Sequence, residues 1–295
     1  MTGRVRTAVI PAGGLGTRFL PFTRALPKEL LPLVDTPVID HVVSACAAAG
    51  IERVVIVGAP GKGTLEAYFA PSPRVEARLV ADGRSEDLER LRRAQQLAEI
   101  RFVEQPDAKG NGHAVLVARE AVGNEPFAML WGDNLVVGAS SGIAQLINAR
   151  DRLGGSVAAA KRVPRELAGR YGMFAGKAVD AGTLRVSAVV EKPAPADAPS
   201  DLASVHGYVL EPEIFGLLAD QPPGRGGEIW LTDAVTRLAQ TQPVWAIVLE
   251  GRDYDAGDRA GYVTAFVDHA LERDDTGPAL RKHLEDAGWR PPAAR

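Results

Sequence analysis

The sequence predicts an α/β protein with a Rossmann-like, doubly wound mixed sheet that carries helices on both faces. Three observations support this fold class. Apolar runs of strand length alternate with stretches of helical periodicity from the start of the chain. The early runs are apolar throughout, which is typical of strands in a sheet covered on both faces. A glycine-rich loop directly follows the first run, at a place where sheets of this class bind ligands.

The first half of the chain contains four of the expected strands. They cover residues 7–11, 53–57, 100–104 and 127–131, and Trp131 is expected in the core. The expected helices between them cover residues 37–49, 63–69 and 112–121, and Gly50 ends the first of these. Residues 72–98 carry many arginines and acids, and we expect them to form a solvated helical insertion.

The pattern changes after about residue 151. Strands are expected at 156–163, 205–210 and 244–249, and a twisted pair at 171–175 and 184–190 encloses a turn at 176–182. Helices are expected at 213–219, 231–239 and 259–271, and the end at 290–295 is expected to fray. No linker divides the chain, so we expect a single domain of residues 1–295, with halves of about 5–150 and 151–272 and a C-terminal tail of 273–295.

Composition excludes several classes of partner. The chain has 34 Lys and Arg against 37 Asp and Glu, so a net charge of -3 gives no reason to expect nucleic acid or an anionic membrane as a partner. No stretch approaches the roughly 20 apolar residues of a membrane helix, and we find no signal peptide. The single cysteine, Cys46, lies in an apolar run and is expected in the core, which is consistent with a cytoplasmic protein.

The glycine-rich loop contains Gly13, Gly14 and Gly16 and ends in Arg18. Glycines let the backbone approach a ligand closely, free amides can hold phosphate oxygens, and arginine adds a cationic fork. The loop lacks the P-loop pattern. Its dinucleotide fingerprint is broken because Phe19 occupies the third glycine position. A nicotinamide-dependent oxidoreductase is therefore a disfavoured alternative from another class.

The segment that follows the loop is rich in proline. We expect residues 21–32 to form an extended, rigid arm without a regular helix, because proline restricts its own backbone and that of the residue before it. With the end of the loop, this arm presents Arg18, Arg24, Lys28 and Glu29. Several cations on one stiff segment are suited to binding a polyphosphate.

Further short motifs follow in order along the chain. The set comprises Gly14-Leu15-Gly16-Thr17-Arg18, Pro27-Lys28-Glu29-Leu30-Leu31-Pro32, Gln105 with Ala108-Lys109-Gly110 and Gly112-His113-Ala114, Gly132-Asp133, Tyr171-Gly172, Val190-Glu191-Lys192-Pro193, Gly207-Tyr208-Val209-Leu210, Gly227-Glu228-Ile229 with Leu231-Thr232-Asp233-Ala234, and Asp255 with Gly257. Over roughly residues 5–270, this set resembles the signature of the sugar-phosphate nucleotidyltransferases, and most closely of the members that join UTP to glucose 1-phosphate.

The resemblance implies the nucleotidyltransferase (GT-A-like) version of the predicted fold, with a nucleotide-binding first half and a sugar-phosphate-binding second half. It implies attack of a sugar phosphate oxygen on the α-phosphorus of UTP, with Mg²⁺ as cofactor and pyrophosphate as the leaving group. Because both reactants are anions, such catalysis must hold them in line and neutralise their charge. The resemblance also implies a homodimer or homotetramer.

The resemblance places the nucleotide on the glycine-rich loop and on two later segments. Glu29 and Gln105 are implied to bind the uracil, and their side chains are suited to hydrogen bonds with a base edge. The other implied nucleotide contacts are Ala12, Gly13, Gly14, Gly16, Thr17, Gly110 and Gly112. The implied catalytic residues are Arg18, Lys28, Asp133 and Lys192.

The implied metal site consists of two aspartates. Asp133 directly follows an apolar strand, and a carboxylate there can hold Mg²⁺, which takes one or two protein carboxylates plus substrate phosphates. Asp255 matches the second metal-linked aspartate of the family. An aspartate near a glycine is more often a turn residue, so the role of Asp255 rests on the resemblance.

The implied sugar-phosphate site lies at the end of the strand expected at 184–190. Lys192 is implied to contact the sugar phosphate, and Glu191 to accept hydrogen bonds from the sugar hydroxyls. Gly172 and Gly207 are implied to let the sugar approach the backbone.

Several alternatives stay open on the sequence alone. A thymidylyltransferase is one, because its base differs from uracil by a methyl group, which a pocket distinguishes only modestly. Another sugar 1-phosphate, such as galactose 1-phosphate, is a second. A sugar-nucleotide sensor without catalysis is disfavoured, because Asp133 and Lys192 are both present. Arg24 stands where the family commonly has lysine, which leaves its role open.

Overall fold

A computed structural model describes residues 3–61 and 63–289 of the chain. Its main sheet contains β1 (Thr7–Pro11), β4 (Arg53–Gly58), β5 (Glu99–Glu104), β6 (Phe127–Leu130), β8 (Ser156–Arg162), β9 (Gly172–Ala178), β10 (Thr183–Glu191), β11 (Leu202–Leu210) and β12 (Val244–Val248). The strand order is β5-β4-β1-β6-β11-β8-β12-β10-β9. Strands β5, β4, β1 and β6 are parallel, whereas β11 is antiparallel to both β6 and β8. The predicted mixed sheet is therefore confirmed.

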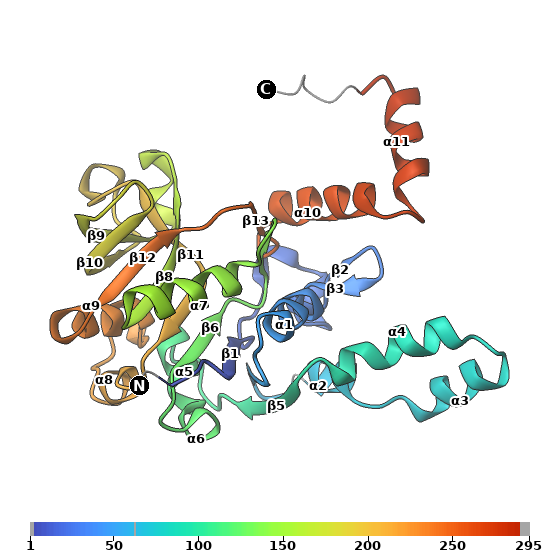
Figure 1. Ribbon diagram of the computed structural model, residues 1–295, viewed down its shortest axis with the longest axis horizontal. Helices are drawn as coiled ribbons and strands as arrows, with labels where there is room; N and C mark the ends of the chain where they lie inside the picture. Colours follow the sequence, from blue (N-terminus) through green and yellow to red (C-terminus); the bar gives the residue numbers. More distant parts are fainter. Residues whose placement is uncertain (1–2, 62, 290–295) are drawn as a thin grey trace.

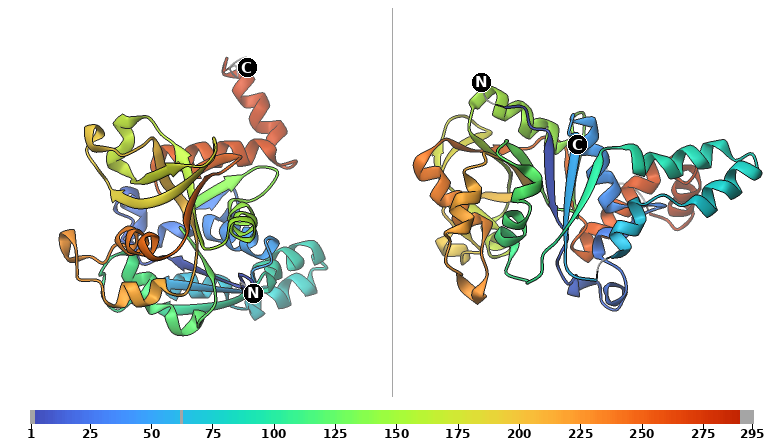
Figure 2. Two further views of the ribbon diagram at one scale, coloured as in Figure 1. Left: turned by 60° about the vertical axis from the view of Figure 1, so that its left-hand side comes forward. Right: turned by 90° about the horizontal axis from the view of Figure 1, so that it is seen from below.

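Helices cover both faces of this sheet (Figures 1 and 2). One face carries α1 (Val38–Ala48), α2 (Gly63–Phe69) and α7 (Gly142–Leu153), and the other carries α5 (Asn111–Val117), α8 (Ile214–Ala219) and α9 (Leu231–Thr241). Alternate residues of one strand point to opposite faces, so Ile10 joins the core under α1 while Val9 joins the core under α5 and α8. Both side chains are fully buried, which explains why the strand is apolar throughout.

Strand β1 lies where the sheet changes direction of winding. It pairs in parallel with β4 on one side and with β6 on the other. The backbone N–H of Ala12 extends the first pairing by donating to Val57 O at 2.7 Å. In open α/β sheets, ligands bind beyond the carboxyl ends of strands at such a switch point. The glycine-rich loop therefore begins at the position that this topology makes available for a ligand.

A second, two-stranded sheet stands beside the main one. It pairs β7 (Asn134–Val137) with β13 (Arg252–Asp255) in antiparallel fashion, and Asn134 lies opposite Asp255. Neither strand was predicted, and neither was helix α7. The sequence of β13, Arg-Asp-Tyr-Asp, lacks the apolar alternation of a strand, so its conformation depends on its tertiary partner.

The predicted extended arm at 21–32 is wrong in its conformation. Residues in and before it form three single 3₁₀ turns, η1 (Thr17–Phe19), η2 (Phe22–Arg24) and η3 (Lys28–Leu30), followed by a short hairpin of β2 (Pro32–Leu33) and β3 (Thr36–Pro37). Pro21 and Pro27 stand immediately before η2 and η3. Proline prevents a long helix but is compatible with the start of a short turn, which explains the difference.

The C-terminal region also differs from the prediction. The predicted tail of 273–295 contains helix α11 (Gly277–Asp286), which follows α10 (Arg259–Glu272). The predicted frayed end at 290–295 lies outside the described residues. The helix expected at 112–121 is divided into α5 and α6 (Arg119–Val122). Among the described residues, no helix is both long enough and apolar enough to span a bilayer.

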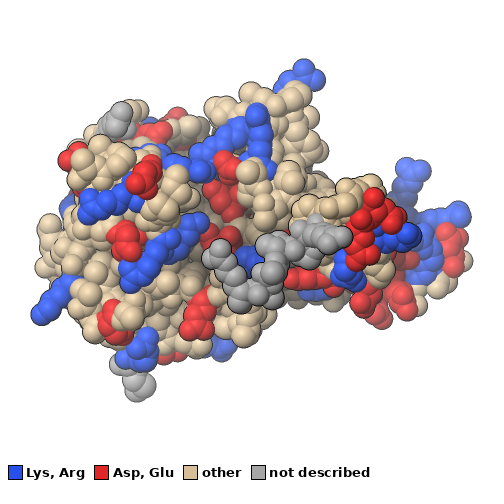
Figure 3. Space-filling view, turned by 90° about the horizontal axis from the view of Figure 1, so that it is seen from above, with Lys and Arg blue, Asp and Glu red and all other residues tan. Residues whose placement is uncertain are grey.

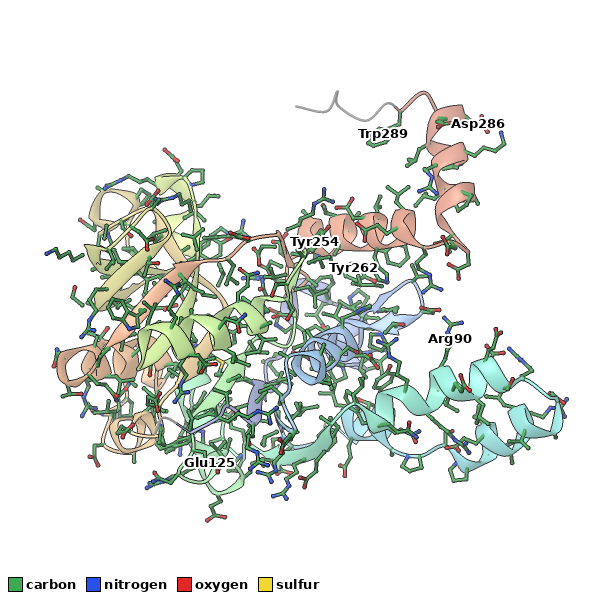
Figure 4. The ribbon with its side chains drawn as sticks, viewed as in Figure 1. Arg90, Glu125, Tyr254, Tyr262, Asp286 and Trp289 are labelled. Atoms are coloured by element: carbon green, nitrogen blue, oxygen red, sulfur yellow. The ribbon has the colours of Figure 1, made fainter. Side chains whose placement is uncertain are left out.

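The helical insertion predicted at 72–98 is confirmed. It forms an arm of α3 (Pro73–Ala81) and α4 (Ser85–Gln96) that projects from the body (Figure 1). Basic and acidic side chains are mixed on the arm (Figure 3). Arg90 reaches from α4 toward the body, where its Nη2 donates to Asp35 Oδ2 at 2.7 Å (Figure 4). The same carboxylate binds Arg273 at 2.6 Å, so the arm and the end of α10 share one anchor.

The contact of β11 with β6 leads to a prediction about Gly207. A Cβ on Gly207 would lie only 2.1 Å from Met129 O, so the glycine allows two strands to pair. We expect Gly207→Ala to lower the free energy of unfolding by about 1–3 kcal/mol, as in other overpacked sites. The measurement is urea unfolding.

Gly216→Ala is the control, because a Cβ there meets no atom within 4 Å and Gly216 lies inside α8. We expect this control to gain about 0.5–1 kcal/mol, since alanine is the better helix former. Unchanged stability of Gly207→Ala would show that β11 and β6 do not require glycine.

Candidate active site

Two adjoining pockets open at the carboxyl edge of the main sheet. The first, the loop pocket, has a volume of ≈ 280 Å³ and is lined by Pro11, Gly13, Gly14, Lys28, Glu29, Gln105, Ala108, Gly110, Asn111, Ala114, Trp131 and Glu228. The second, the charged cleft, has a volume of ≈ 390 Å³ and is lined by residues of β8, β9, β10 and β11 together with side chains that include Arg18, Lys28, Asp133 and Asp255. Lys28, Asn111 and Trp131 line both pockets, so a ligand in one pocket would meet a ligand in the other.

Two polar side chains form the inner wall of the loop pocket. Glu29 is 2% exposed and Gln105 is 7% exposed. The Gln105 Nε2 donates to Gly110 O at 3.1 Å and lies 3.1 Å from His113 Nδ1, which orients the amide. A Cβ on Gly13 would lie 3.0 Å from Gln105 Oε1, so glycine leaves room for this side chain. The pocket thus presents an oriented amide and a carboxylate to any flat, polar ligand.

Several of the predicted nucleotide residues support the pocket from behind instead of lining it. The Gly112 N–H donates to Ile229 O at 2.8 Å, and a Cβ on Gly112 would meet the same oxygen at 2.8 Å. Gly16 has a φ of 63°, and its carbonyl accepts a hydrogen bond from Thr23 Oγ1 at 2.8 Å. Ala12 is buried, and Thr17 begins the first 3₁₀ turn. These residues shape the loop through packing and turn geometry.

The charged cleft is rich in cations. It is lined by Arg18, Lys28, Lys161, Arg170 and Lys192, and it also contains Asp133, Asp255 and Glu191. Five basic side chains outnumber three acidic ones, so the cleft is suited to anions. Sequence reasoning found Arg18, Lys28 and Lys192 but missed Lys161 and Arg170. Lys161 stands near the end of the strand expected at 156–163, and this position could have marked it as a candidate site residue.

Asp133 and Asp255 meet at one point of the cleft. Asp133 follows β6, and Asp255 ends β13, which pairs with β7. A Cβ on Gly257 would lie 2.2 Å from Asp133 Oδ2 and 3.1 Å from Asp255 Oδ1, so both carboxylates point at the same spot. Burial and the nearby Asp133 raise the pKa of Asp255. Two carboxylates in this arrangement can hold a divalent cation.

Lys28 neutralises this acidic pair. Its ammonium group forms an ion pair with Asp133 and lies 4.0 Å from Glu29 Oε1. Burial lowers the pKa of Lys28, but the charges of Asp133, Glu29 and Asp255 outweigh burial and leave the pKa raised. The ammonium therefore stays charged at the junction of the two pockets, where it can contact ligands in both.

Glu191 and Lys192 lie across the cleft at the end of β10. Glu191 is opposite Gly172 in the pairing with β9, and Gly172 lines the cleft. The Lys192 Nζ lies 3.7 Å from Glu191 Oε1 and 5.1 Å from the centre of the Trp230 ring. Burial raises the pKa of Glu191 despite this neighbouring cation. Lys192 has a φ of 46°, an uncommon conformation for lysine that is often found at functional sites.

The structure bears on two further expectations and corrects one of them, the core position of Trp131. Gly207 is not among the lining residues of the charged cleft, but His206 and Tyr208 on either side of it are, so its sugar-binding role stays a prediction; its close approach to Met129 O independently requires a glycine. Trp131 was expected in the core, but it is only partly buried and lines both pockets. Trp131 directly follows β6, at the edge of the sheet where the two pockets begin. Asn111, which sequence reasoning missed, accepts a hydrogen bond from Leu231 N at 2.9 Å.

Residues 7–272 match the family model described as nucleotidyl transferase. The chain belongs to this family. A Bacillus subtilis (strain 168) relative named UTP--glucose-1-phosphate uridylyltransferase is 42% identical over 282 residues, which cover 96% of this chain and 97% of the relative. A relative of the same name from Staphylococcus haemolyticus (strain JCSC1435) is 39% identical over 286 residues, which cover 97% of this chain and 99% of the relative.

Solved structures of the same kind share the nucleotidyl transferase fold with this chain. A UTP-bound UGPase from Acinetobacter baumannii has a TM-score of 0.86 at 32% identity, covering 96% of this chain and 99% of the other. A UDP-glucose pyrophosphorylase complexed with UDP-glucose has a TM-score of 0.83 at 34% identity, covering 91% of this chain and 100% of the other. The predicted nucleotidyltransferase version of the Rossmann-like fold is thereby confirmed.

His206 is a buried group on the wall of the charged cleft. It is 4% exposed, has a φ of 53°, and its Nδ1 lies 3.2 Å from Asn134 Oδ1. Burial lowers the pKa of His206 to about 4. The unfolded chain binds a proton at this histidine below its ordinary pKa of 6.5, whereas the folded chain does so only near 4. Stability is therefore lost as the pH falls through this window.

This histidine leads to a prediction about acid stability. His206→Asn removes the titration, and asparagine tolerates the positive φ. We expect the loss of unfolding free energy between pH 7 and pH 4 to be smaller in the variant by about 3 kcal/mol. The measurement is urea unfolding across this pH range. His283→Asn, at an exposed histidine, is the control. An unchanged pH dependence in His206→Asn would contradict the assignment.

Proposed function

We propose that this protein transfers the uridylyl group of UTP to α-D-glucose 1-phosphate and releases pyrophosphate. The observation that carries the proposal is the junction of the two pockets, where Lys28, Asp133 and Asp255 meet. A nucleotide in the loop pocket and a sugar phosphate in the charged cleft would bring their phosphates to this junction. The names of relatives that are 39–42% identical to this chain support the choice of UTP and glucose 1-phosphate.

The proposed reaction exchanges one bond at the α-phosphorus of UTP for another. A phosphate oxygen of the sugar attacks the α-phosphorus of UTP, and the bond from that phosphorus to the bridging oxygen breaks as pyrophosphate leaves. No proton needs to be moved for this exchange, so the protein's task is to align two anions and neutralise them. Arg18 and Lys28 would hold the polyphosphate, and Lys192 would hold the sugar phosphate from the opposite wall.

The other predicted residues would bind the base or the sugar, or shape the glycine-rich loop. Glu29 and Gln105 would bind the uracil edge at the buried end of the loop pocket, with Gly13, Gly14 and Gly110 at the pocket wall. Glu191 would accept hydrogen bonds from sugar hydroxyls, and Gly172, which lines the cleft, would let the sugar approach the backbone. Ala12, Gly16, Thr17 and Gly112 would act by shaping the loop.

We propose Mg²⁺ as the cofactor, held by Asp133 and Asp255. The donor set fits this ion, because both carboxylates point at one spot and Mg²⁺ needs few protein ligands when phosphates complete its shell. Within residues 3–61 and 63–289, no group of three or more Asp, Glu, His or Cys side chains is arranged to hold a metal ion with protein ligands alone. When bound, Mg²⁺ would neutralise charge on the phosphate oxygens. A cytoplasmic homodimer or homotetramer completes the proposal.

The first test compares substrates. The protein is incubated with Mg²⁺, glucose 1-phosphate and UTP, dTTP, ATP, GTP or CTP in turn, and pyrophosphate is measured. We expect UTP to give the highest kcat/KM, and galactose 1-phosphate to be used less well than glucose 1-phosphate. Faster reaction with dTTP would favour a thymidylyltransferase. Absence of pyrophosphate with every nucleotide would contradict catalysis and favour the sensor alternative.

The second test removes one group from each wall of the cleft. We expect Asp133→Asn and Lys192→Met each to lower kcat/KM by roughly 100-fold or more, because each removes a charge that stabilises the transition state. We expect EDTA to abolish activity and added Mg²⁺ to restore it. Lys177→Met, at an exposed lysine on β9, is the control and should keep normal activity. Normal rates in either variant, with an unchanged melting temperature, would refute the role of that residue.

A further inference from the structure

The segment that carries Asp255 is held by cations from three other parts of the chain. Lys161, near the end of β8, donates through Nζ to Asp253 Oδ2 at 2.6 Å. Arg170 donates through Nη2 to Asp258 Oδ2 at 3.3 Å, and Arg18 donates through Nη1 to Gly257 O at 3.3 Å. Within residues 253–258, one of these contacts therefore precedes Asp255 and two follow it.

Lys161 and Arg170 also meet at one aromatic ring. The Lys161 Nζ lies 5.5 Å from the centre of the Tyr171 ring, and the Arg170 guanidinium carbon lies 5.9 Å from it. Both distances are within the range of a cation–π contact. The backbone of Tyr171 accepts a hydrogen bond from Lys192 N at 2.9 Å, and the next residue is Gly172. The same cations therefore touch the turn proposed to bind the sugar and the segment proposed to bind the metal.

The Lys161–Asp253 pair is the stronger of the two links. The side chains of Lys161 and Asp253 are 32% and 16% exposed, whereas both side chains of the Arg170–Asp258 pair are more exposed. The second carboxylate oxygen of Asp253 is buried and has no hydrogen-bond partner among the described residues. A partly buried ion pair is screened less by water than a surface pair, so it holds its partners more firmly.

We propose that Lys161 is a positioning residue that couples the two ligand sites. Through Asp253 it holds β13, and therefore Asp255, and through the Tyr171 ring it holds the turn at Gly172. The inference rests on the proposed function, since it assigns a metal to Asp255 and a sugar to the turn. It predicts that loss of Lys161 weakens the binding of both the cation and the sugar phosphate. The binding of uracil in the loop pocket should not change.

A direct contact between Lys161 and the sugar phosphate is the competing explanation. The cleft is open enough for that contact, because Lys161 lines it. The two explanations differ in the role of Asp253. If Lys161 acts through Asp253, then removal of either partner has the same effect. If Lys161 binds phosphate directly, then Asp253→Asn leaves the ammonium free to do so and preserves the affinity for the sugar phosphate.

The experiment uses Lys161→Met, Asp253→Asn, their double variant and Lys161→Arg in the full chain. Mn²⁺ binding in the presence of UTP is measured by electron paramagnetic resonance, and KM is measured for both substrates. We expect each single variant to weaken Mn²⁺ roughly tenfold and to raise the KM for glucose 1-phosphate by a similar factor, as for other residues that orient metal ligands. The KM for UTP should change less than about threefold.

The double variant tests the coupling. We expect it to be no worse than the poorer single variant, because the two side chains act as one unit. In Lys161→Met, the carboxylate of Asp253 loses its ion-pair partner, which could prevent folding. The double variant replaces that carboxylate with an amide, so it tests the proposal even if the single variant does not fold. We expect Lys161→Arg to restore most of the affinity, and Lys177→Met on β9 is the control.

Two outcomes would overturn the proposal. One is unchanged Mn²⁺ affinity in folded Lys161→Met. The other is a normal KM for glucose 1-phosphate in Asp253→Asn together with a raised KM in Lys161→Met. If the wild-type protein releases no pyrophosphate, the proposed function fails, but the Mn²⁺ measurements on the same variants still decide whether Lys161 holds the segment around Asp255.

Discussion

The charged cleft depends on the pairing of β7 with β13. Asp133 and Asp255 lie far apart in the sequence, and this two-stranded sheet helps to bring their carboxylates to one spot. The pairing places Asn134 opposite Asp255, and Ala256 N donates to Asp133 O at 2.8 Å beyond it. Burial and, after it, the like charge of Asp133 raise the pKa of Asp255 in this position. The surrounding cations offset the repulsion between the two carboxylates.

Those cations come from different elements of the fold. Lys28 follows the glycine-rich loop, Lys161 lies on β8, and Lys192 follows β10. Each has an acidic neighbour in the chain, which holds its positive charge in place. Because the groups are already oriented, an anionic ligand would exchange partners with them and would need little rearrangement of the chain. Tyr262 of α10 (Figure 4) connects this helix to β2 by donating to Pro32 O at 2.8 Å, and its ring contacts that of Phe19 edge to face.

Much of this arrangement could be predicted from the sequence. Apolar strands and the polar residues directly after them pointed to the glycine-rich loop, Asp133 and the Glu191-Lys192 pair, and the resemblance to the family supplied their roles. The residues that were missed or misplaced depend on contacts between distant segments. The Arg-Asp-Tyr-Asp sequence of β13 has no strand pattern of its own, and the single 3₁₀ turns after the loop have too few residues to show a period. The packing roles of Gly112 and Gly207 become visible only when their neighbours are known.

The α3–α4 arm has a different consequence. None of the described side chains of α4 is buried, and the arm is tied to the body by charged contacts such as that of Arg90 with Asp35. Substitutions there disturb little apolar packing, so selection for a stable core places few demands on its sequence. Substitutions on the exposed face of α4 would therefore leave the main sheet and the charged cleft unchanged. It is also the natural place to attach a reporter domain or an affinity tag without disturbing the sheet.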